Sequence, residues 1–302
     1  MYTHFLRFTD RAALLSIETF FFKINDSPEA KKFYSQYKLG QIWERNQRHL
    51  INKISSAENF WVVFKEILRN HADYGYHEHG VYDSVREEYI NQYLDSFNNR
   101  YGPNSLESVT DGTTFEFSQD GFPQTYKIGK TSVSASSIRY LAWEKDMLEA
   151  IGHDLHCFCE IGGGYGGWTR HLKLRFPKGT FIILDLPFTC VIAHKYLEVS
   201  MPGVNVNLIQ EAGAKIVEGA INIVPTCFIQ GTRFPDIDFL FNAHSFGEMD
   251  NETMLFFKGQ IEQNLQPKYL FQINRFLNSF VGNDEIRKNH SLGSMWMNNQ
   301  LS

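Results

Sequence analysis

A cluster of glycines near the middle of the chain constrains its fold more than any other feature. The segment His156–Ile161 has the composition of a short buried strand, and the next six residues, 162–167, include five glycines. A helix is expected from Trp168 to Arg175. Because glycine accepts positive φ angles and has no Cβ to obstruct an approaching group, this strand–loop–helix unit is typical of ligand-binding α/β folds. A tight turn without a ligand would need fewer glycines.

The segments after this loop alternate between strands and helices. Phe181–Leu184 predicts a buried strand that ends at Asp185, and Phe188–Ser200 predicts a helix. The further expected elements are strands at Val204–Ile209 or Ile221–Val224, Ile237–Asn242 and Tyr269–Ile273, and a helix at Asn251–Asn264. Apolar strands that alternate with helices predict an α/β fold with a mostly parallel, doubly wound sheet covered on both faces.

The first 130 residues differ from the rest and are expected to form a mainly helical N-terminal region. Apolar residues recur at helical spacing over Phe60–Leu68 and again over Val81–Tyr101. Over 113–130 apolar and polar residues alternate around an Asp-Gly turn, which predicts a short hairpin. We therefore predict two regions, a helical one over 1–130 and the sheet domain over 131–302.

Composition indicates the size of the molecule and the partners it can have. With 302 residues, the chain is long enough for two domains and for a hydrophobic core without disulfide bonds. Its 34 acidic residues outnumber 29 basic ones, which gives a net charge of −5. Such a chain has no basic surface to neutralise a phosphate backbone, so nucleic acid is not an expected partner.

The cysteines and the N-terminus favour a cytoplasmic protein. The four cysteines are Cys157, Cys159, Cys190 and Cys227, and none has C-x-x-C spacing. We expect them to be reduced thiols in the core. The N-terminus lacks a signal-peptide pattern, and the apolar stretch Ala12–Phe22 is too short to cross a bilayer, so no membrane span is expected.

The glycine loop fits two ligand-binding patterns. Gly162, Gly164 and Gly167 match G-x-G-x-x-G, which holds a dinucleotide. Glu160 with Gly162, Gly164 and Gly166 matches E-x-G-x-G-x-G, the pattern of S-adenosylmethionine (SAM) methyltransferases. A carboxylate beside the loop would repel a pyrophosphate, whereas SAM carries an ammonium, a sulfonium and no phosphate. The acidic residue therefore favours SAM over a nicotinamide cofactor.

Asp185 ends the strand that follows the glycine loop, 19 residues beyond Gly166. A carboxylate there can accept hydrogen bonds from both hydroxyls of an adenosine ribose. The segment Glu160–Pro187 resembles the class I SAM-dependent O-methyltransferases, which implies a Rossmann-like fold and S-adenosyl-L-methionine as cofactor. In such families an acidic residue before the glycines and another after the second strand bind the cofactor. The resemblance thus implies a cofactor-binding set of Glu160, Gly162, Gly163, Gly164, Gly166 and Asp185.

Segments further along the chain resemble the sugar O-methyltransferase family. They are Phe241–Met249 (Phe-Asn-Ala-His-Ser-Phe-Gly-Glu-Met), Ile273–Arg275 and, upstream, Ser136–Leu141. The resemblance covers about 130–276 and implies that the acceptor is a sugar hydroxyl on a small molecule or glycan. In this fold the fifth strand is usually followed by a helix and an antiparallel strand pair, but only 27 residues follow Arg275. Either the chain is truncated or its sheet is shorter than in the family.

His244 is the expected general base. Methyl transfer from SAM releases a neutral thioether, so catalysis depends on alignment and on removal of the acceptor's hydroxyl proton. His244 follows a predicted strand. In plant-type O-methyltransferases, which the chain resembles, a histidine at the matching place acts as the general base. Glu248 is expected to orient the imidazole or to bind a sugar hydroxyl. Alternatively, His244 bonds a loop carbonyl while Glu248 and Asp250 open the next helix, with Asp250 as its N-cap.

Other clusters are weaker candidates. His77-Glu78-His79 has no third ligand nearby in the sequence, so no metal site is expected there. Tyr74, Tyr76 and Tyr82 could stack on a sugar, but such residues more often pack between helices. Asn274-Arg275, after a predicted strand, is a modest candidate for substrate contact.

Several functions are compatible with these patterns. The leading one is SAM-dependent O-methylation of a sugar hydroxyl, and the second is O-methylation of a phenolic or polyketide small molecule. A third is a non-catalytic binding protein with the SAM-binding fold, and an NAD-dependent oxidoreductase is the most distant. The helical N-terminal region is expected to form a lid over the acceptor pocket or a homodimer surface.

Overall fold

The computed structural model describes residues 11–37, 64, 82–103, 105–106, 125–128, 131–273 and 295–298. The chain divides into two compact units. The first comprises Met1–Leu14 and Ser56–His153, and the second comprises Leu15–Ser55 and Asp154–Ser302. This division differs from the boundary expected near residue 130 in two ways, because Leu15–Ser55 belongs with the sheet and the first unit extends to His153.

The first unit contains two described helices and a short hairpin. The helices are α5 (Tyr82–Tyr101) and α7 (Ala135–Ile151), and the strands are β1 (Tyr126–Ile128) and β2 (Thr131–Val133). Ser134 caps α7, since its hydroxyl accepts a hydrogen bond from the Ser137 amide. The helices are joined at Asp146, which accepts a hydrogen bond from the Tyr101 hydroxyl and pairs with Arg100 at 2.6 Å.

The described hairpin is a different pair of strands from the predicted one, most of which lies outside the described residues. β1 and β2 pair antiparallel, with Tyr126 opposite Val133 and Ile128 opposite Thr131. The expected hairpin had its turn at Asp120-Gly121, and residues 107–124 lie outside the described part of the chain. The described pair thus joins the second half of the predicted hairpin to the segment before α7.

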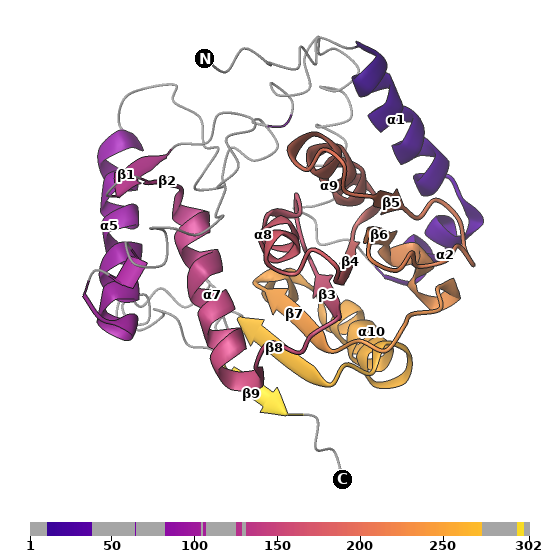
Figure 1. Cartoon of the computed structure of the whole chain (residues 1–302). Coiled ribbons are helices and arrows are strands. Elements are labelled where there is room, and N and C mark those ends of the chain that lie inside the picture. Colours follow the sequence, from indigo (N-terminus) through magenta and orange to yellow (C-terminus); the bar gives the residue numbers. More distant parts are fainter. Residues whose placement is uncertain are drawn as a thin grey trace. The chain divides into compact units, whose positions relative to one another are not determined.

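The second unit is built on one seven-stranded sheet (Figure 1). In spatial order its strands are β5 (Val206–Leu208), β6 (Ile221–Pro225), β4 (Thr180–Asp185), β3 (Cys157–Ile161), β7 (Phe239–Ala243), β8 (Tyr269–Ile273) and β9 (Met295–Asn298). The first six are parallel, whereas β9 runs antiparallel to β8. Both segments proposed as alternative strands, now β5 and β6, join the sheet.

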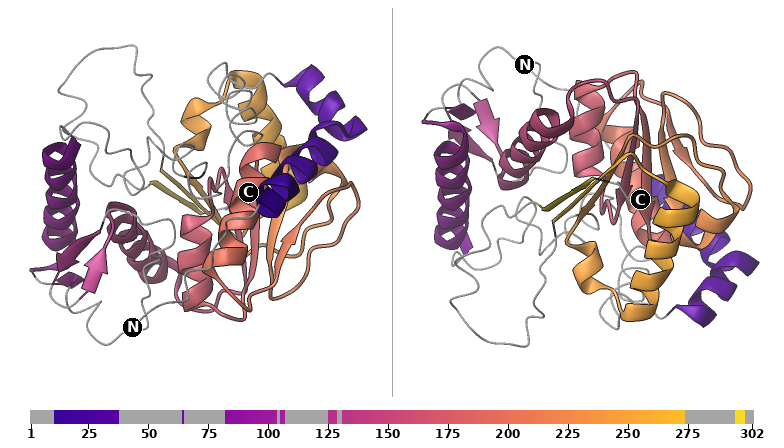
Figure 2. Two further views of the ribbon diagram at one scale, coloured as in Figure 1. Left: turned by 90° about the horizontal axis from the view of Figure 1, so that it is seen from above. Right: turned by 90° about the horizontal axis from the view of Figure 1, so that it is seen from below.

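Helices cover both faces of this sheet. They are α8 (Gly167–Arg175), α9 (Pro187–Ser200) and α10 (Asn251–Gln260), which continues into a π-helical turn, η3 (Ile261–Leu265). Figures 1 and 2 show α8 and α9 on one face and α10 on the other. All five residues of β3 are buried, as a strand covered on both faces requires. The predicted Rossmann-like α/β fold is confirmed.

Two N-terminal helices pack against this sheet unit, and they explain why a stretch from the start of the chain belongs to it. They are α1 (Arg11–Asn25) and α2 (Pro28–Gln36). The ring of Phe21 on α1 meets Phe188 of α9 edge-on, with 5.8 Å between centroids. The ring of Phe33 on α2 meets Phe256 of α10 at 5.4 Å. These contacts between buried aromatic side chains hold the N-terminal segment to the unit that contains the glycine loop.

The cysteines agree with the sequence prediction. All four are buried free thiols, and burial raises the pKa of the Cys157 and Cys227 thiols to about 12. They therefore behave as small apolar core residues. Within the described ranges, every helix is too short or too polar to traverse a bilayer.

Candidate functional site

The register of the parallel strands brings four chain segments to one edge of the sheet. Ile161 of β3 lies opposite both Leu184 of β4 and Asn242 of β7. Asp185, the last residue of β4, lies opposite Pro225 of β6. The strand order reverses between β3 and β7, and a doubly wound sheet opens a ligand crevice at such a point.

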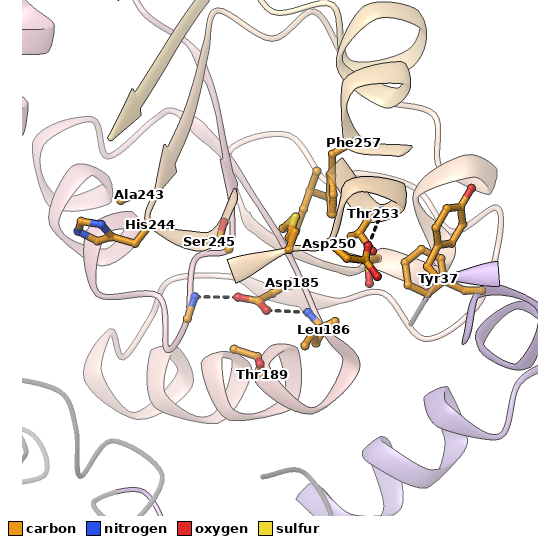
Figure 3. A pocket seen from close by; sticks show the side chains of 16 residues that line it. Tyr37, Asp185, Leu186, Thr189, Ala243, His244, Ser245, Asp250, Thr253 and Phe257 are labelled. Atoms are coloured by element: carbon orange, nitrogen blue, oxygen red, sulfur yellow. Dashed lines mark hydrogen bonds between the residues drawn. The ribbon is translucent and has the colours of Figure 1, made fainter. Parts of the chain in front are cut away.

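A cavity of about 240 Å³ lies at this edge. Gly162 and Gly164 line it from the loop after β3, and Asp185 from the end of β4. His244 lies at one end of the cavity and Tyr37, the residue after α2, at the other (Figure 3). The structure therefore brings together the glycine loop, the acidic residue after the second strand and the candidate base.

The glycines of the loop serve different physical purposes. Gly162, Gly164 and Gly166 all have positive φ angles, of 75°, 57° and 87°. A Cβ at Gly162 would overlap the Ser245 side chain, so this glycine permits close contact between two loops of the protein itself. A Cβ at Gly164 would meet no atom within 4 Å. Gly164 is therefore required by its backbone conformation, which L side chains disfavour.

Asp185 is held by two backbone amides. Its Oδ2 accepts a hydrogen bond from the Gly164 amide at 2.8 Å, and its Oδ1 accepts one from the Leu186 amide at 2.7 Å. Figure 3 shows both bonds at the cavity wall. A carboxylate offers about four acceptor positions in all. These amides thus fix the orientation of the acid and tie the glycine loop to the end of β4.

Glu160 lies beneath the glycine loop, and it is not one of the residues that line the cavity. It is 7% exposed, and its Oε2 accepts a hydrogen bond from the Thr169 hydroxyl at 2.7 Å. A Cβ at Gly163 would approach the same Oε2 to 3.1 Å. Burial, reinforced by the charge of Asp185, raises the pKa of Glu160 to about 7. The structure therefore separates the two acids, with Asp185 in the wall and Glu160 under the loop.

The turn after β7 is fastened to β3 by two polar side chains. Asn242 is fully buried, and its amide donates a hydrogen bond to the Ile161 carbonyl at 2.9 Å and another to the Ser245 hydroxyl. The Ser245 hydroxyl donates to the same Ile161 carbonyl at 3.2 Å. A polar amide inside an otherwise apolar strand was the sequence signal for this link, and the sequence analysis did not use it.

His244 begins a short 3₁₀ turn, η2 (Ser245–Glu248), in a left-handed conformation with φ of 67°. Its amide donates a hydrogen bond to the Ile273 carbonyl at 2.7 Å, and its carbonyl accepts one from the Gly247 amide at 3.0 Å. Non-glycine residues in this conformation are uncommon and concentrate at functional sites. The half-buried His244 is thus held by its backbone at the end of the cavity.

The two acids after His244 have different roles. Asp250 is the N-cap of α10, because its Oδ1 accepts a hydrogen bond from the Thr253 amide at 2.8 Å. This capping role was predicted, but Asp250 also lines the cavity. The Glu248 side chain lies outside the part of the structure that is described. Its expected roles stay predictions.

The remaining candidates fall mostly outside the described residues. These are His77, Glu78, His79, Tyr74, Tyr76, Asn274 and Arg275. Tyr82 is the first residue of α5, in the other unit. Among the described side chains, no three or more of His, Cys, Asp and Glu gather in an arrangement that could hold a metal ion.

Helix α2 is the part of the site that the sequence analysis missed. Phe33 of α2 lines the cavity, and so does Tyr37, the residue that follows this helix. Thr226 lines the cavity as well. More than a hundred residues separate α2 from the glycine loop, and no spacing rule connects them. Only tertiary packing brings them to the same cavity.

No family model matches this chain, and no curated protein matches its sequence. Among solved structures, it is similar to the pyocyanin biosynthetic protein PhzM, with 14% identity, a TM-score of 0.33 and coverage of 80% of this chain and 61% of that one. The plantazolicin methyltransferase BpumL in complex with SAH shares 11% identity, with a TM-score of 0.29 and coverage of 78% and 63%. Coclaurine N-methyltransferase bound to N-methylheliamine and SAH shares 12% identity, with a TM-score of 0.31 and coverage of 87% and 63%. The matches span less than two thirds of each of those proteins.

Proposed function

We propose that this chain is a SAM-dependent methyltransferase whose acceptor is a sugar hydroxyl. The observation that carries the proposal is an acidic cavity at the reversal point of the sheet, with Asp185 held against a glycine loop. Two carboxylates, Asp185 and Asp250, line this cavity, and its described wall includes no lysine or arginine. Such a wall suits a cationic ligand with no phosphate better than a pyrophosphate.

The residues present fit SAM. Asp185, oriented by the Gly164 and Leu186 amides, would accept hydrogen bonds from the two ribose hydroxyls. The backbone at Gly162 and Gly164 would lie against the aminoacyl part, toward His244. The carboxylate of Glu160 lies beneath the glycine loop. Glu160 would therefore affect SAM binding indirectly, through the shape of that loop and the charge beneath it.

The chemistry would require little from the protein beyond alignment and one proton transfer. SAM supplies a methyl group activated by its sulfonium, and the thioether left behind needs no acid. His244, at the end of the cavity, would take the proton from the acceptor hydroxyl as that oxygen attacks. Glu248 would orient the imidazole or bind another hydroxyl of the sugar.

The sugar acceptor is supported by the resemblance of Phe241–Met249 and Ile273–Arg275 to sugar O-methyltransferases. A phenolic or polyketide acceptor would be served by the same cavity and base. Transfer of tritium from labelled SAM to a panel of sugars and phenols separates the two. Transfer to phenols alone would replace the sugar proposal, and tight SAM binding without any transfer would favour a binding protein. Because the reaction needs no Lewis acid, we expect EDTA to leave transfer unchanged.

Calorimetric titration tests the ligand directly. The wild-type chain is titrated with SAM, with its product S-adenosylhomocysteine (SAH), and with NADH. We expect SAM and SAH to bind and NADH to show no saturable binding. Binding of NADH without SAM would overturn the proposal in favour of an oxidoreductase.

A further inference from the structure

Two carboxylates lie on opposite sides of the glycine loop. Asp185 lines the cavity and accepts a hydrogen bond from the Gly164 amide at 2.8 Å, as Figure 3 shows. Glu160 lies beneath the loop, where a Cβ at Gly163 would come within 3.1 Å of its Oε2. Because residues 162–164 have no side chains, it is backbone that separates the Glu160 carboxylate from the cavity.

Glu160 has no positive partner, in contrast to Asp238, the buried acid that precedes β7. Burial alone would raise the pKa of Asp238, but Lys268 at 2.6 Å and two backbone amides bond its carboxylate and lower that pKa. Glu160 is 7% exposed, and the hydroxyl that bonds its Oε2 at 2.7 Å belongs to Thr169. Among the described residues, no basic side chain pairs with Glu160. Its ionised form therefore lacks a countercharge within the described part of the chain.

The groups that face Glu160 come from β3, α8 and the two neighbouring strands. β3 contributes the Cys159 thiol, which stays neutral because burial raises its pKa well above the usual value. α8 contributes Thr169, whose hydroxyl and amide both bond the carboxylate. The flanking residues in the sheet register are apolar, Ile183 of β4 and Phe241 of β7. The charged neighbour is Asp185, so the nearest charge disfavours a second carboxylate.

The net charge of a ligand in the cavity should therefore decide the ionisation of Glu160. Burial and the charge of Asp185 raise the pKa of Glu160 to about 7, so both of its forms are present near neutral pH. A positive charge on the cavity side of the loop favours the ionised form, since little solvent lies between the two charges. SAM carries a sulfonium that SAH lacks, whereas both carry an ammonium and a carboxylate. The two ligands thus differ by one positive charge.

We propose that Glu160 makes the cavity selective for ligand charge: its buried carboxyl group releases a proton to water when SAM binds and retains more of that proton when SAH binds. The preference for SAM over SAH then increases as the pH rises. The inference rests on the proposed function, and it gives Glu160 a part in discriminating cofactor from product without touching either. Thr169 is the positioning residue that holds the carboxylate beneath the loop.

Calorimetric titration of wild-type protein and Glu160→Gln between pH 5 and pH 8 tests this inference. In the wild type, the ratio of SAM affinity to SAH affinity should rise by about threefold to tenfold, which corresponds to a Glu160 pKa lowered by about 0.5–1 when SAM replaces SAH. In Glu160→Gln that part of the rise should be absent. Ligand ammonium groups titrate alike in both proteins, so the difference between the two isolates Glu160.

Proton release gives a second readout that does not depend on affinity. Titrations at pH 7 in two buffers of different ionisation enthalpy measure the protons released on binding. In the wild type, SAM should release about 0.2–0.4 of a proton more than SAH does. Glu160→Gln should lose that excess.

Thr169→Val and Thr169→Ser form a matched pair for the positioning residue. The valine removes the hydroxyl that stabilises the ionised carboxylate, so the pH at which the SAM preference changes should move upward by about 0.4–1. The serine keeps a hydroxyl and should restore the wild-type midpoint. A purely structural role for Thr169 would lower the melting temperature and leave the midpoint unchanged.

The outcomes separate this inference from the function on which it rests. If wild-type protein binds neither SAM nor SAH, the proposed function fails and the charge selectivity fails with it. If it binds both with a ratio that is independent of pH, or if Glu160→Gln keeps the same pH dependence, the inference is refuted while the function stands. An equal midpoint in Thr169→Val and the wild type would remove Thr169 from the proposal.

Discussion

At the scale of single residues, the polar groups at the site are oriented mainly by backbone atoms of neighbouring strands. Asp185 is fixed by the amides of Gly164 and Leu186, and Asn242 by the carbonyl of Ile161. A buried polar group without such partners would destabilise the fold, so each bond both stabilises the strand ends and aims a side chain. The hydrogen bonds that stabilise the strand ends are thus the same ones that orient the side chains of the site.

His244 can be tested by two substitutions. His244→Ala and His244→Asn should each lower the turnover of methyl transfer by about 10²–10⁴-fold, because both remove the proposed general base. Asparagine tolerates the left-handed conformation of this position better than alanine, so it separates loss of the base from backbone strain. Turnover and the dissociation constant of SAH are measured side by side. A fall in SAH affinity as large as the fall in turnover would indicate a structural role instead.

Glu160 predicts a pH dependence of stability. Burial raises its pKa from 4.5 to about 7, so the folded state binds this proton more tightly than the unfolded state does. The contribution of the protonated Glu160 to the free energy of unfolding is therefore full below pH 4.5. It is lost as the pH rises through about 7. Glu160→Gln should flatten the change in the free energy of unfolding between pH 5 and pH 8, measured by urea titration. An unchanged slope in the variant would assign the pH dependence to other groups.

At the scale of elements, the site depends on contact between the turn after β3 and the turn after β7. Gly162 lies against Ser245, and Ser245 bonds the carbonyl that precedes Gly162. The two turns flank the point where the strand order reverses, so their packing sets the width of the crevice. The glycine at this position therefore reflects a contact between protein segments as well as space for a ligand.

Gly162→Ala and Gly164→Ala form a matched pair that tests this contact. Both alanines are strained by positive φ, at a cost of about 1–2 kcal/mol each. Only Gly162→Ala also forces a Cβ into Ser245, so it should lower the free energy of unfolding by about 1–3 kcal/mol more.

Adding Ser245→Gly to Gly162→Ala should recover part of that difference, since the overlapping atoms are removed. Denaturant titration of the two single variants and the double variant measures the coupling. Strict additivity of Gly162→Ala and Ser245→Gly would show that the two turns are not in contact.

At the scale of the whole molecule, the N-terminal segment and the sheet unit form one compact unit even though the first unit separates them in sequence. α1 and α2 pack on α9 and α10 through aromatic rings, and α2 lines the cavity. A ligand in that cavity would therefore stabilise a segment at the start of the chain together with loops from its middle.

Hydrogen exchange measures this coupling. Saturating SAH should slow exchange of the amides in Pro28–Gln36 as well as in the glycine loop and the turn after β7. The last residues of α10 together with η3, over Lys258–Leu265, are the internal reference and should change little. Slower exchange in the glycine loop with no change in α2 would show that α2 does not respond to the ligand.

The sequence analysis identified the elements whose signals are local. The alternation of apolar strands with helices predicted the sheet, and Tyr269–Ile273 is a strand over the predicted residues. The glycine loop, the position of Asp185 and the capping role of Asp250 were also predicted, because each depends on residues a few positions apart. The parallel order of the strands then brought Asp185 and His244 to one edge.

The sequence by itself therefore determined the fold class and the presence of an acidic, glycine-lined crevice, since periodicity and turn chemistry are properties of short segments. The tertiary structure alone decided that Glu160 lies under the loop while Asp185 faces the cavity, and that Gly162 makes room for Ser245. It also brought α2 and Thr226 to the far end of the cavity. Each of these arrangements depends on packing between segments far apart in the chain, where burial and shape complementarity act and no sequence spacing records them.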